Sequence, residues 1–275
     1  MTPSPPSEHR PEGPAARRWR ALLESWAIPD DILARATEDP WRLPPRLFRP
    51  PADAAADPPD DPGMRLARAA LPTGGSVLDV GCGAGASSLP LAPPAAQLTG
   101  VDASADMLAA FAAAAAVRGV DVRTVEGRWP DVADRAGTVD VVVCRHVLYN
   151  VPDPGPFAAA LDAAARHRVV LVLGEHHPKH RDAPLWRHFH GLERPDGPTA
   201  DDALAVLAEA GIKAQVARWS TPPRERSAQE RAESADLARR NLCLEPGREQ
   251  EVSVLLEPLY AQPRADVALW WDVSR

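Results

Sequence analysis

The stretch that decides the fold is Val77-Leu78-Asp79-Val80-Gly81-Cys82-Gly83-Ala84-Gly85. An apolar run leads directly into three glycines at alternate positions, and a segment of helical character follows. Glycine is needed where the backbone turns tightly and where a ligand must approach the main chain closely. We therefore expect a strand, a turn and a helix, with the turn at the carboxyl end of a central strand. Open α/β sheets bind their ligands there.

An acidic residue at the end of the next apolar run supports a nucleoside site. Asp102 follows Gly81 by about 20 residues, a spacing at which acids hold a ribose in nucleotide-binding folds. Gly81, Gly83 and Ala86 also satisfy the dinucleotide fingerprint G-x-G-x-x-A. Asp79 argues against that alternative, because its charge would repel a pyrophosphate. It suits a cofactor that has a cationic amino group, a sulfonium and no phosphate.

The flanking sequence predicts an α/β fold. Short β-branched apolar runs alternate with segments of helical spacing, which is typical of βαβ units around a parallel sheet. Val169–Leu173 is one such run, a further strand is expected from Ile212 to Trp219, and 265–273 is expected to close the chain as an edge strand. The other expected strands are 77–80, 98–101, 120–125 and 139–144, and the expected helices are 64–71, 86–92, 104–118, 154–166 and 200–210.

The segments outside this core divide the chain further. Residues 1–14 are rich in Pro and charge, and we expect them to be disordered. Residues 15–62 are expected to form a helical extension and a linker, followed by the main domain over 63–275. A helical insertion is expected over about 224–261, with a break at Pro246-Gly247, before the last strand.

Composition excludes several classes of protein. The formal net charge is −7, whereas a dedicated nucleic-acid binder usually has a basic face. No apolar run approaches the roughly 18 residues of a membrane span, and the N-terminus lacks the apolar core of a secretory signal. Cys82, Cys144 and Cys243 are scattered and form neither a disulfide framework nor a CxxC pair. We expect a cytoplasmic protein that binds neither nucleic acid nor membrane.

Four segments in order resemble the motifs of class I S-adenosylmethionine-dependent methyltransferases. The glycine stretch at 77–85 resembles the first motif, and Val101–Leu108 resembles the second. Val125–Pro130 resembles the third and Asp140–Val151 the fourth. The resemblance covers residues 75 to about 175. It implies a Rossmann-like, seven-stranded, mostly parallel sheet with flanking helices, a helical N-terminal extension and a helical insertion before the last strand.

The resemblance also implies roles for individual residues. Asp79 and the glycine turn would frame the methionine part of S-adenosylmethionine, Asp102 would hold the ribose, and Arg145 would lie near the transferred methyl group. The third motif usually has Asp where Arg128 stands, so Trp129 or backbone groups would replace its contact with the adenine. The expected cofactor-binding residues are Asp79, Gly81, Cys82, Gly83, Gly85, Asp102, Ala103, Met107, Gly127, Arg128, Trp129 and Arg145. For Trp129 the alternative is a residue that packs on the sheet.

His146, just past the fourth strand, is the candidate general base, with Tyr149 nearby; its alternative role is to line the pocket. Glu175 and the histidines at 176, 177, 180, 188 and 190 follow the fifth strand and could contact the acceptor or lie in a solvated loop. A metal site is not expected, because the histidines lack a spaced ligand set. The N-P-P-Y pattern of enzymes that methylate base or glutamine amino groups is absent.

The sequence thus predicts a methyltransferase that acts on a small-molecule acceptor and leaves S-adenosylhomocysteine. Two alternatives stay open. One is an NAD(P)-dependent oxidoreductase, and the other is a non-catalytic protein of the same fold that binds the cofactor. The acceptor and the oligomeric state are not predicted.

Overall fold

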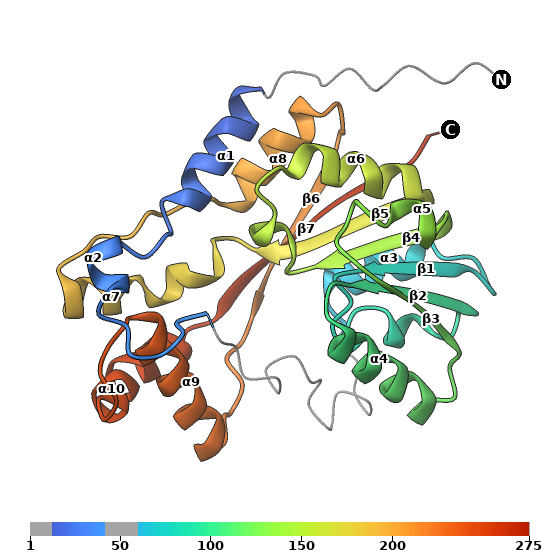
Figure 1. Ribbon diagram of the computed structural model, residues 1–275. Helices are drawn as coiled ribbons and strands as arrows, with labels where there is room; N and C mark the ends of the chain where they lie inside the picture. The colour runs from blue at the N-terminus through green and yellow to red at the C-terminus, as the bar shows by residue number, and fades with distance from the viewer. Residues whose placement is uncertain (1–12, 42–59, 275) are drawn as a thin grey trace.

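A seven-stranded sheet forms the centre of the computed structural model, which describes residues 13–41 and 60–274 (Figure 1). The strand order is β3-β2-β1-β4-β5-β7-β6. Strands β1 to β5 run parallel to one another, and β7 runs antiparallel to both β5 and β6. The predicted α/β class is confirmed. The bounds are β1 Ser76–Val80, β2 Gln97–Asp102, β3 Val122–Glu126, β4 Val139–Arg145, β5 Ala165–Gly174, β6 Gln215–Thr221 and β7 Arg264–Asp272.

The prediction that the last strand is an edge strand is wrong. β7 lies between β5 and β6, where Leu269 is in register with Leu171 on one side and Val216 on the other. Val267, Ala268 and Leu269 have no exposed surface. The continuous apolar run of β7 suits a strand that is buried on both faces, and β6 forms the edge instead.

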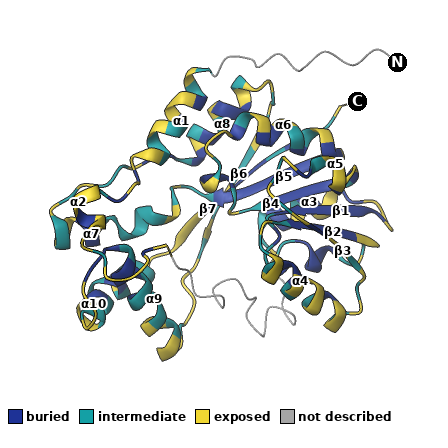
Figure 2. Cartoon of the chain, in the orientation of Figure 1, coloured by how far each residue is buried: buried dark blue, intermediate teal, exposed yellow. Residues whose placement is uncertain are grey.

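Helices cover both faces of the sheet, and two separate clusters of buried side chains lie beneath them. Successive residues of a strand enter different clusters, as Val77 and Leu78 do. The central strands β1, β4 and β5 are largely dark blue in Figure 2, whereas the outer surfaces of the helices are largely yellow. One layer contains α1 Pro14–Glu24, α5 Ala133–Ala136, α6 Pro154–Ala164 and α8 Ala200–Glu209, and the other contains α3 Pro62–Ala69 and α4 Ala105–Val117.

Local sequence explains where these helices begin. The hydroxyl of Ser104 accepts a hydrogen bond from Met107 N at the start of α4, and Thr199 and Asp202 form a capping box at the start of α8. The predicted helix over 86–92 is wrong: only one 3₁₀ turn, η2 Leu89–Leu91, forms there. Pro90 has no N–H to donate, and two further prolines follow at 93 and 94.

A third apolar cluster holds together what we call the helical module: α2 Asp30–Leu33, α7 Ala183–His190, α9 Ala228–Asn241 and α10 Glu249–Tyr260. The chain enters this module after β5 and between β6 and β7, so it adjoins the carboxyl edge of the sheet (Figure 1, lower left). The predicted insertion, with its break at Pro246-Gly247, corresponds to α9 and α10. Figure 1 places α2 beside α7.

The predicted disordered tail and linker fall mainly on residues 1–12 and 42–59, which lie outside the described residues. Pro14 begins α1 and Pro62 begins α3. The domain boundaries therefore stay a prediction. Over residues 13–41 and 60–274, no helix combines the length and the apolar character that crossing a bilayer requires.

Candidate active site

The three alternating glycines form a turn at the carboxyl end of β1. The nitrogens of Gly81 and Cys82 both donate to Val101 O, and the φ angles of Gly81, Gly83 and Gly85 are 71°, 50° and 86°. A Cβ at Gly85 would lie 2.3 Å from the ring of Phe111, so this glycine permits close packing. A Cβ at Gly83 would meet nothing within 4 Å. Gly83 therefore faces open space that a ligand can occupy.

Asp102 connects this turn to the end of β2. Its Oδ2 accepts a hydrogen bond of 3.0 Å from Gly83 N, and its Oδ1 accepts one of 2.9 Å from Ser104 N. A carboxylate has about four acceptor positions, so Asp102 can still accept the hydroxyls of a diol. Ala103, beside it, is exposed, and Met107 is half-buried on the first turn of α4.

Asp79 is the most unusual group at this edge. The residue is 1% exposed, and its Oδ2 accepts a hydrogen bond of 2.7 Å from the Ser88 hydroxyl. Its Oδ1 is buried and has no hydrogen-bond partner among the described residues. Burial raises the pKa of Asp79 to about 7, against the opposing effects of Ser88 and Arg145. A buried carboxylate oxygen without a donor is costly, and a cationic group beside it would satisfy it.

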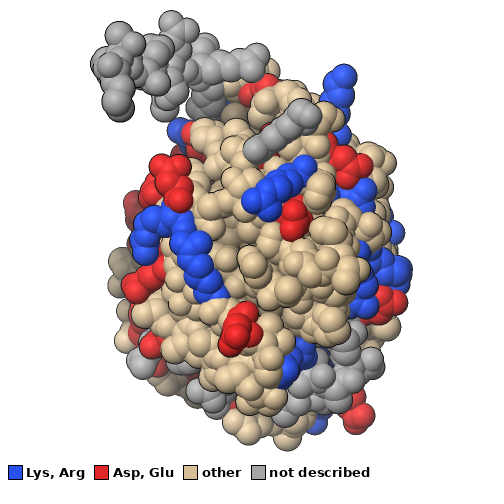
Figure 3. All heavy atoms as spheres, turned by 90° about the vertical axis from the view of Figure 1, so that its right-hand side faces the viewer, with Lys and Arg blue, Asp and Glu red and all other residues tan. Residues whose placement is uncertain are grey.

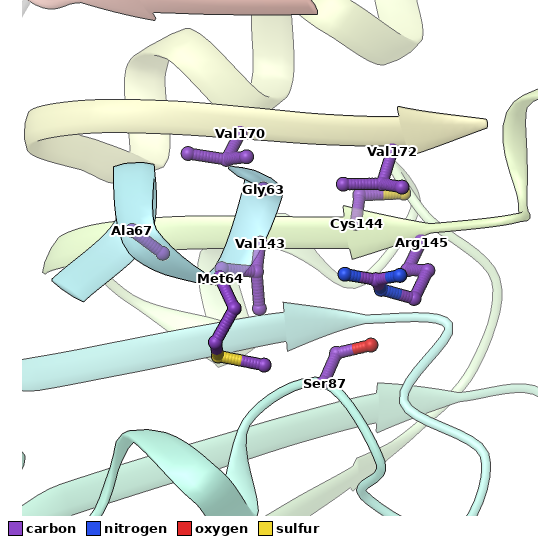
Figure 4. A pocket seen from close by; sticks show the side chains of 9 residues that line it. All are labelled: Gly63, Met64, Ala67, Ser87, Val143, Cys144, Arg145, Val170 and Val172. Carbon is purple, nitrogen blue, oxygen red and sulfur yellow. The ribbon is translucent and has the colours of Figure 1, made fainter. Parts of the chain in front are cut away.

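Arg145 at the end of β4 lines a small pocket on the α3 side of the sheet (Figure 4). Its Nη2 lies 2.6 Å from Asp61 Oδ2, and both side chains are mostly buried. Asp61 also accepts a hydrogen bond from Met64 N through its other carboxylate oxygen. The same side chain therefore caps α3 and orients Arg145. The other pocket-lining residues are Gly63, Met64, Ala67, Ser87, Val143, Cys144, Val170 and Val172.

His146 follows Arg145 and has a φ of 57°, a conformation that few residues other than glycine adopt. Its main-chain nitrogen donates to Val172 O. The residue is exposed, yet desolvation, and then the nearby Arg145 and Arg264, lower the pKa of its imidazole below the usual value. The ring is therefore neutral at pH 7. A neutral imidazole at the carboxyl edge can accept a proton.

The hydroxyl and the ring of Tyr149 are both held by contacts within the fold. Its OH donates to Gly174 O at 2.8 Å, and its ring stacks on Trp19 with centroids 5.5 Å apart. Burial raises the pKa of Tyr149 well above its usual value. Trp19 in turn donates through Nε1 to Val151 O. These contacts attach α1 to the loop after β4.

The loop after β3 contains three residues that were predicted to contact the adenine, and they differ in burial and in packing. Gly127 has a φ of 147°, its nitrogen donates to Asp102 O, and a Cβ there would meet Val132. Arg128 is exposed. Trp129 donates through Nε1 to Phe157 O at 3.2 Å and packs against the cluster beneath α6. These contacts agree with the alternative role of Trp129, in which the side chain packs on the sheet.

The five histidines after β5 occupy separate environments. His177 stacks on Trp26 with centroids 4.8 Å apart, and His176 stacks on His180. His188 lies 3.6 Å from Glu251, and His190 contacts Leu242 O. Within residues 13–41 and 60–274, no three His, Cys, Asp or Glu side chains are placed to hold a metal ion. Glu175 forms an ion pair with Arg218.

Two partners at this edge were missed by sequence reasoning. Ser88 holds Asp79, and Asp61 holds Arg145. The position of Ser88, shortly after the glycine turn, is a weak signal for such a role. Asp61 contacts a residue 84 positions away, and no local pattern encodes that contact.

Comparisons with known proteins agree with this geometry. Residues 77–169 match the family model described as "Methyltransferase domain". A "Ubiquinone biosynthesis O-methyltransferase" from Erwinia tasmaniensis is 43% identical over 82 residues, which are 30% of this chain and 34% of that protein. The same enzyme from Bordetella parapertussis is 38% identical over 96 residues, 34% of this chain and 39% of that one. The chain thus matches about a third of the length of these relatives.

Two solved structures share the fold. The YcgJ protein from Bacillus subtilis superposes with a TM-score of 0.51 at 17% identity, covering 78% of this chain and 98% of that one. A candidate methyltransferase from Bacillus halodurans C-125 gives 0.52 at 17% identity, with 78% and 97% covered. Residues 77–169 thus match a methyltransferase domain, and the sheet order and the glycine turn agree with that match. This segment resembles the matched part of the ubiquinone biosynthesis O-methyltransferases.

Proposed function

We propose that the chain binds S-adenosylmethionine and transfers its methyl group to a small-molecule acceptor, leaving S-adenosylhomocysteine. The buried, unpartnered Oδ1 of Asp79 is the observation that carries this proposal. A carboxylate beside a nucleotide-type glycine turn favours a ligand with a cationic amino group over one with phosphates. The matched methyltransferase segment supports the same function.

The proposed cofactor contacts follow from the positions of the side chains. Asp79 would accept from the amino group, Gly81, Cys82, Gly83 and Gly85 would give the main chain room to approach the ligand, and Asp102 would hold the ribose. Ala103, Met107, Gly127, Arg128 and Trp129 lie on the two loops that would flank the adenine. Arg145, fixed by Asp61, would border the methyl group. We propose these roles as a set.

When bound, the sulfonium supplies a methyl group that is already activated. The nucleophilic atom of the acceptor forms a bond to the methyl carbon as the carbon–sulfur bond breaks, and the electron pair of that bond stays on sulfur. The chain's task is mainly to orient the two reactants, which can lower a barrier by about 7–11 kcal/mol. His146 would take the acceptor's proton where the acceptor keeps one at pH 7.

The fold gives no support to the oxidoreductase alternative. Dinucleotide-binding sheets have the order 3-2-1-4-5-6 with parallel strands, whereas here an antiparallel β7 stands between β5 and β6. The acidic group at position 79 would also oppose a pyrophosphate. On the face shown in Figure 3, the described basic and acidic side chains are interspersed, and the chain's excess of acidic residues suits a small-molecule acceptor better than a nucleic acid. The three unpaired thiols suit the reducing cytoplasm.

The test has two parts. Calorimetry with S-adenosylmethionine, S-adenosylhomocysteine and NAD measures binding without an acceptor, and binding of the first two alone is expected. Incubation with methyl-labelled S-adenosylmethionine and a set of small metabolites then measures transfer. Label transferred to an acceptor supports catalysis, whereas binding without transfer to any acceptor would favour the non-catalytic alternative.

A further inference from the structure

Asp79 and Arg145 point to the same face of the sheet from neighbouring strands. Asp79 of β1 is in register with Val143 of β4, and Arg145 lies two residues beyond Val143. Val77 and Val143 both belong to the apolar cluster on the α3 side. Because side chains two residues apart on a strand share a face, Asp79 and Arg145 point to that side as well. With about 5 Å between strands and about 7 Å along two residues, their Cα atoms lie about 8 Å apart, within reach of an arginine side chain.

Two carboxylates are therefore within reach of one guanidinium. Nη2 of Arg145 lies 2.6 Å from Asp61 Oδ2, and Figure 4 shows the guanidinium turned into the pocket. The same positive charge acts on Asp79, where it opposes the rise in pKa that burial causes. Asp79 Oδ1 nevertheless has no hydrogen-bond partner in the described parts of the chain. The structure thus pairs Arg145 with Asp61 and leaves this oxygen of Asp79 without a donor.

The first turn of α3 is packed closely enough to fix the position of Asp61. Its Oδ1 accepts a hydrogen bond of 2.9 Å from Met64 N. A Cβ at Gly63 would lie 2.6 Å from Val172 Cγ2 and 3.6 Å from Arg145 Nη2, so this turn approaches the sheet where no side chain would fit. The backbone of α3 therefore holds the Asp61 carboxylate beside Arg145.

Two further carboxylates at the carboxyl edge of the sheet are already engaged. Asp102 accepts from two main-chain nitrogens, and the buried Asp266, at the start of β7, lies 2.9 Å from Arg264 Nε. A guanidinium released from Asp61 would therefore find its free acceptor at Asp79 Oδ1. An arginine bonded there would satisfy the buried carboxylate. It would also take the position that a cationic amino group of a ligand requires.

We propose that Asp61 is a positioning residue that holds Arg145 away from Asp79 and so keeps the Asp79 carboxylate open for the amino group of S-adenosylmethionine. This inference rests on the proposed function for the identity of the ligand. Asp61 acts through Arg145 and does not itself touch the cofactor. Arg145 remains an anchored cation beside the site and does not compete with the amino group.

A double-mutant cycle tests this competition. Calorimetry at about pH 8, above the pKa of about 7 of Asp79, measures S-adenosylmethionine binding to wild type, Asp61→Asn, Arg145→Gln and the double variant. Asn caps a helix as well as Asp does, so Asp61→Asn keeps the start of α3. It should lower the affinity at least about tenfold when Arg145 is present, and less than about twofold in the Arg145→Gln background. Equal losses in both backgrounds, or no loss with Arg145 present, overturn the inference.

Control variants separate charge from folding. Asp60→Asn makes the same change at an exposed neighbour, which lies 3.2 Å from Arg65, and should leave the affinity unchanged. Asp61→Glu keeps the charge and should retain more affinity than Asp61→Asn. Thermal melting checks that each variant folds. Asp61→Ser, a second uncharged capping residue, repeats the cycle if Asp61→Asn is unfolded at the assay temperature.

The titration of Asp79 in the cofactor-free chain gives a readout that does not depend on the ligand. Carbon-13 NMR of labelled aspartate carboxyl groups follows it, and Asp79→Asn assigns the signal. The described groups close to Asp79 are Ser88, Arg145, Asp102 and the thiols of Cys82 and Cys144. Burial raises the pKa of both thiols, so they stay uncharged through this titration.

Asp61→Asn should move the titration of Asp79 at least about one pH unit lower, because the released Arg145 then favours the ionised carboxylate. The same substitution should have no effect in the Arg145→Gln background. An unchanged titration in folded Asp61→Asn overturns the inference. The proposed function fails, by contrast, when wild type and all variants ignore S-adenosylmethionine, and the titration then still decides whether Asp61 keeps Arg145 from Asp79.

Discussion

The main-chain nitrogen of Gly83 donates a 3.0 Å hydrogen bond to Oδ2 of Asp102, so the turn after β1 and the end of β2 are held as one unit. The other carboxylate oxygen accepts from Ser104 N at the start of α4. One side chain therefore fixes two loops and still has acceptor positions for a ligand.

Asp102→Ala should weaken S-adenosylmethionine binding by about 1.5–3 kcal/mol, because it removes hydrogen bonds to a charged acceptor. Asp102→Asn, which keeps the shape and one acceptor oxygen, should lose less. Calorimetry measures both affinities, and circular dichroism confirms that the variants are folded. Unchanged affinity in a folded Asp102→Ala protein refutes the ribose role.

Gly83→Ala and Gly85→Ala form a matched pair: the first should mainly lower cofactor affinity, and the second should mainly lower fold stability. A methyl group at Gly85 would overlap the Phe111 ring, so this variant should lose about 1–3 kcal/mol through overpacking, in addition to the backbone strain of a positive φ. A methyl group at Gly83 meets open space, so its folding cost is only the backbone strain of about 1–2 kcal/mol. Gly83→Ala should instead lose cofactor affinity. Denaturant titration and calorimetry separate the two, and an equal loss of stability in both would contradict this assignment.

Affinity for S-adenosylmethionine should fall on acidification because of Asp79. Burial raises its pKa to about 7, and the ionised form is the one that attracts an amino cation. Below that pKa, each pH unit should lower the affinity by up to about tenfold. Asp79→Asn should bind more weakly and show no such dependence between about pH 5 and 7. A wild-type affinity that is constant over this range would argue against a contact between Asp79 and the amino group.

Fold stability should also fall on acidification because of His177. Burial lowers its pKa from 6.5 to about 4, so between these values the unfolded chain binds more protons than the native one. Stability therefore rises with pH across this window and is fully present above 6.5. His177→Phe, which keeps a ring between Trp26 and Tyr149, should flatten the curve of unfolding free energy against pH. Identical slopes in wild type and His177→Phe would exclude this origin.

The sequence predicted most of the sheet because its strands are short apolar runs and its turns contain glycine. The glycine turn and Asp102 lie within about 25 residues of one another, so their meeting could be inferred locally. The alternation within 265–273 predicts an edge strand, whereas the continuous run from Val267 to Trp271 belongs to a strand between β5 and β6. That run was the available signal for burial on both faces.

Other features of the site depend on contacts between distant parts of the chain. The Asp61–Arg145 ion pair joins residues 84 positions apart, and the ring of His177 lies against Trp26 from the N-terminal extension. Neither contact leaves a periodic pattern in the sequence. The histidine-rich loop therefore suggested a solvated segment or an acceptor contact, whereas His177 joins the sheet edge to the N-terminal extension.

The central claim is that the glycine turn, Asp79 and Asp102 together hold an adenosine that bears a cationic sulfur and an amino group. Isothermal calorimetry of the purified, folded chain with S-adenosylmethionine tests it most directly, with NAD as the comparison. We predict saturable binding of S-adenosylmethionine, no binding of NAD, and a stabilisation of about 2.7 kcal/mol at 100 times the dissociation constant. A folded protein that gives no binding heat and no stabilisation with millimolar S-adenosylmethionine would contradict the account.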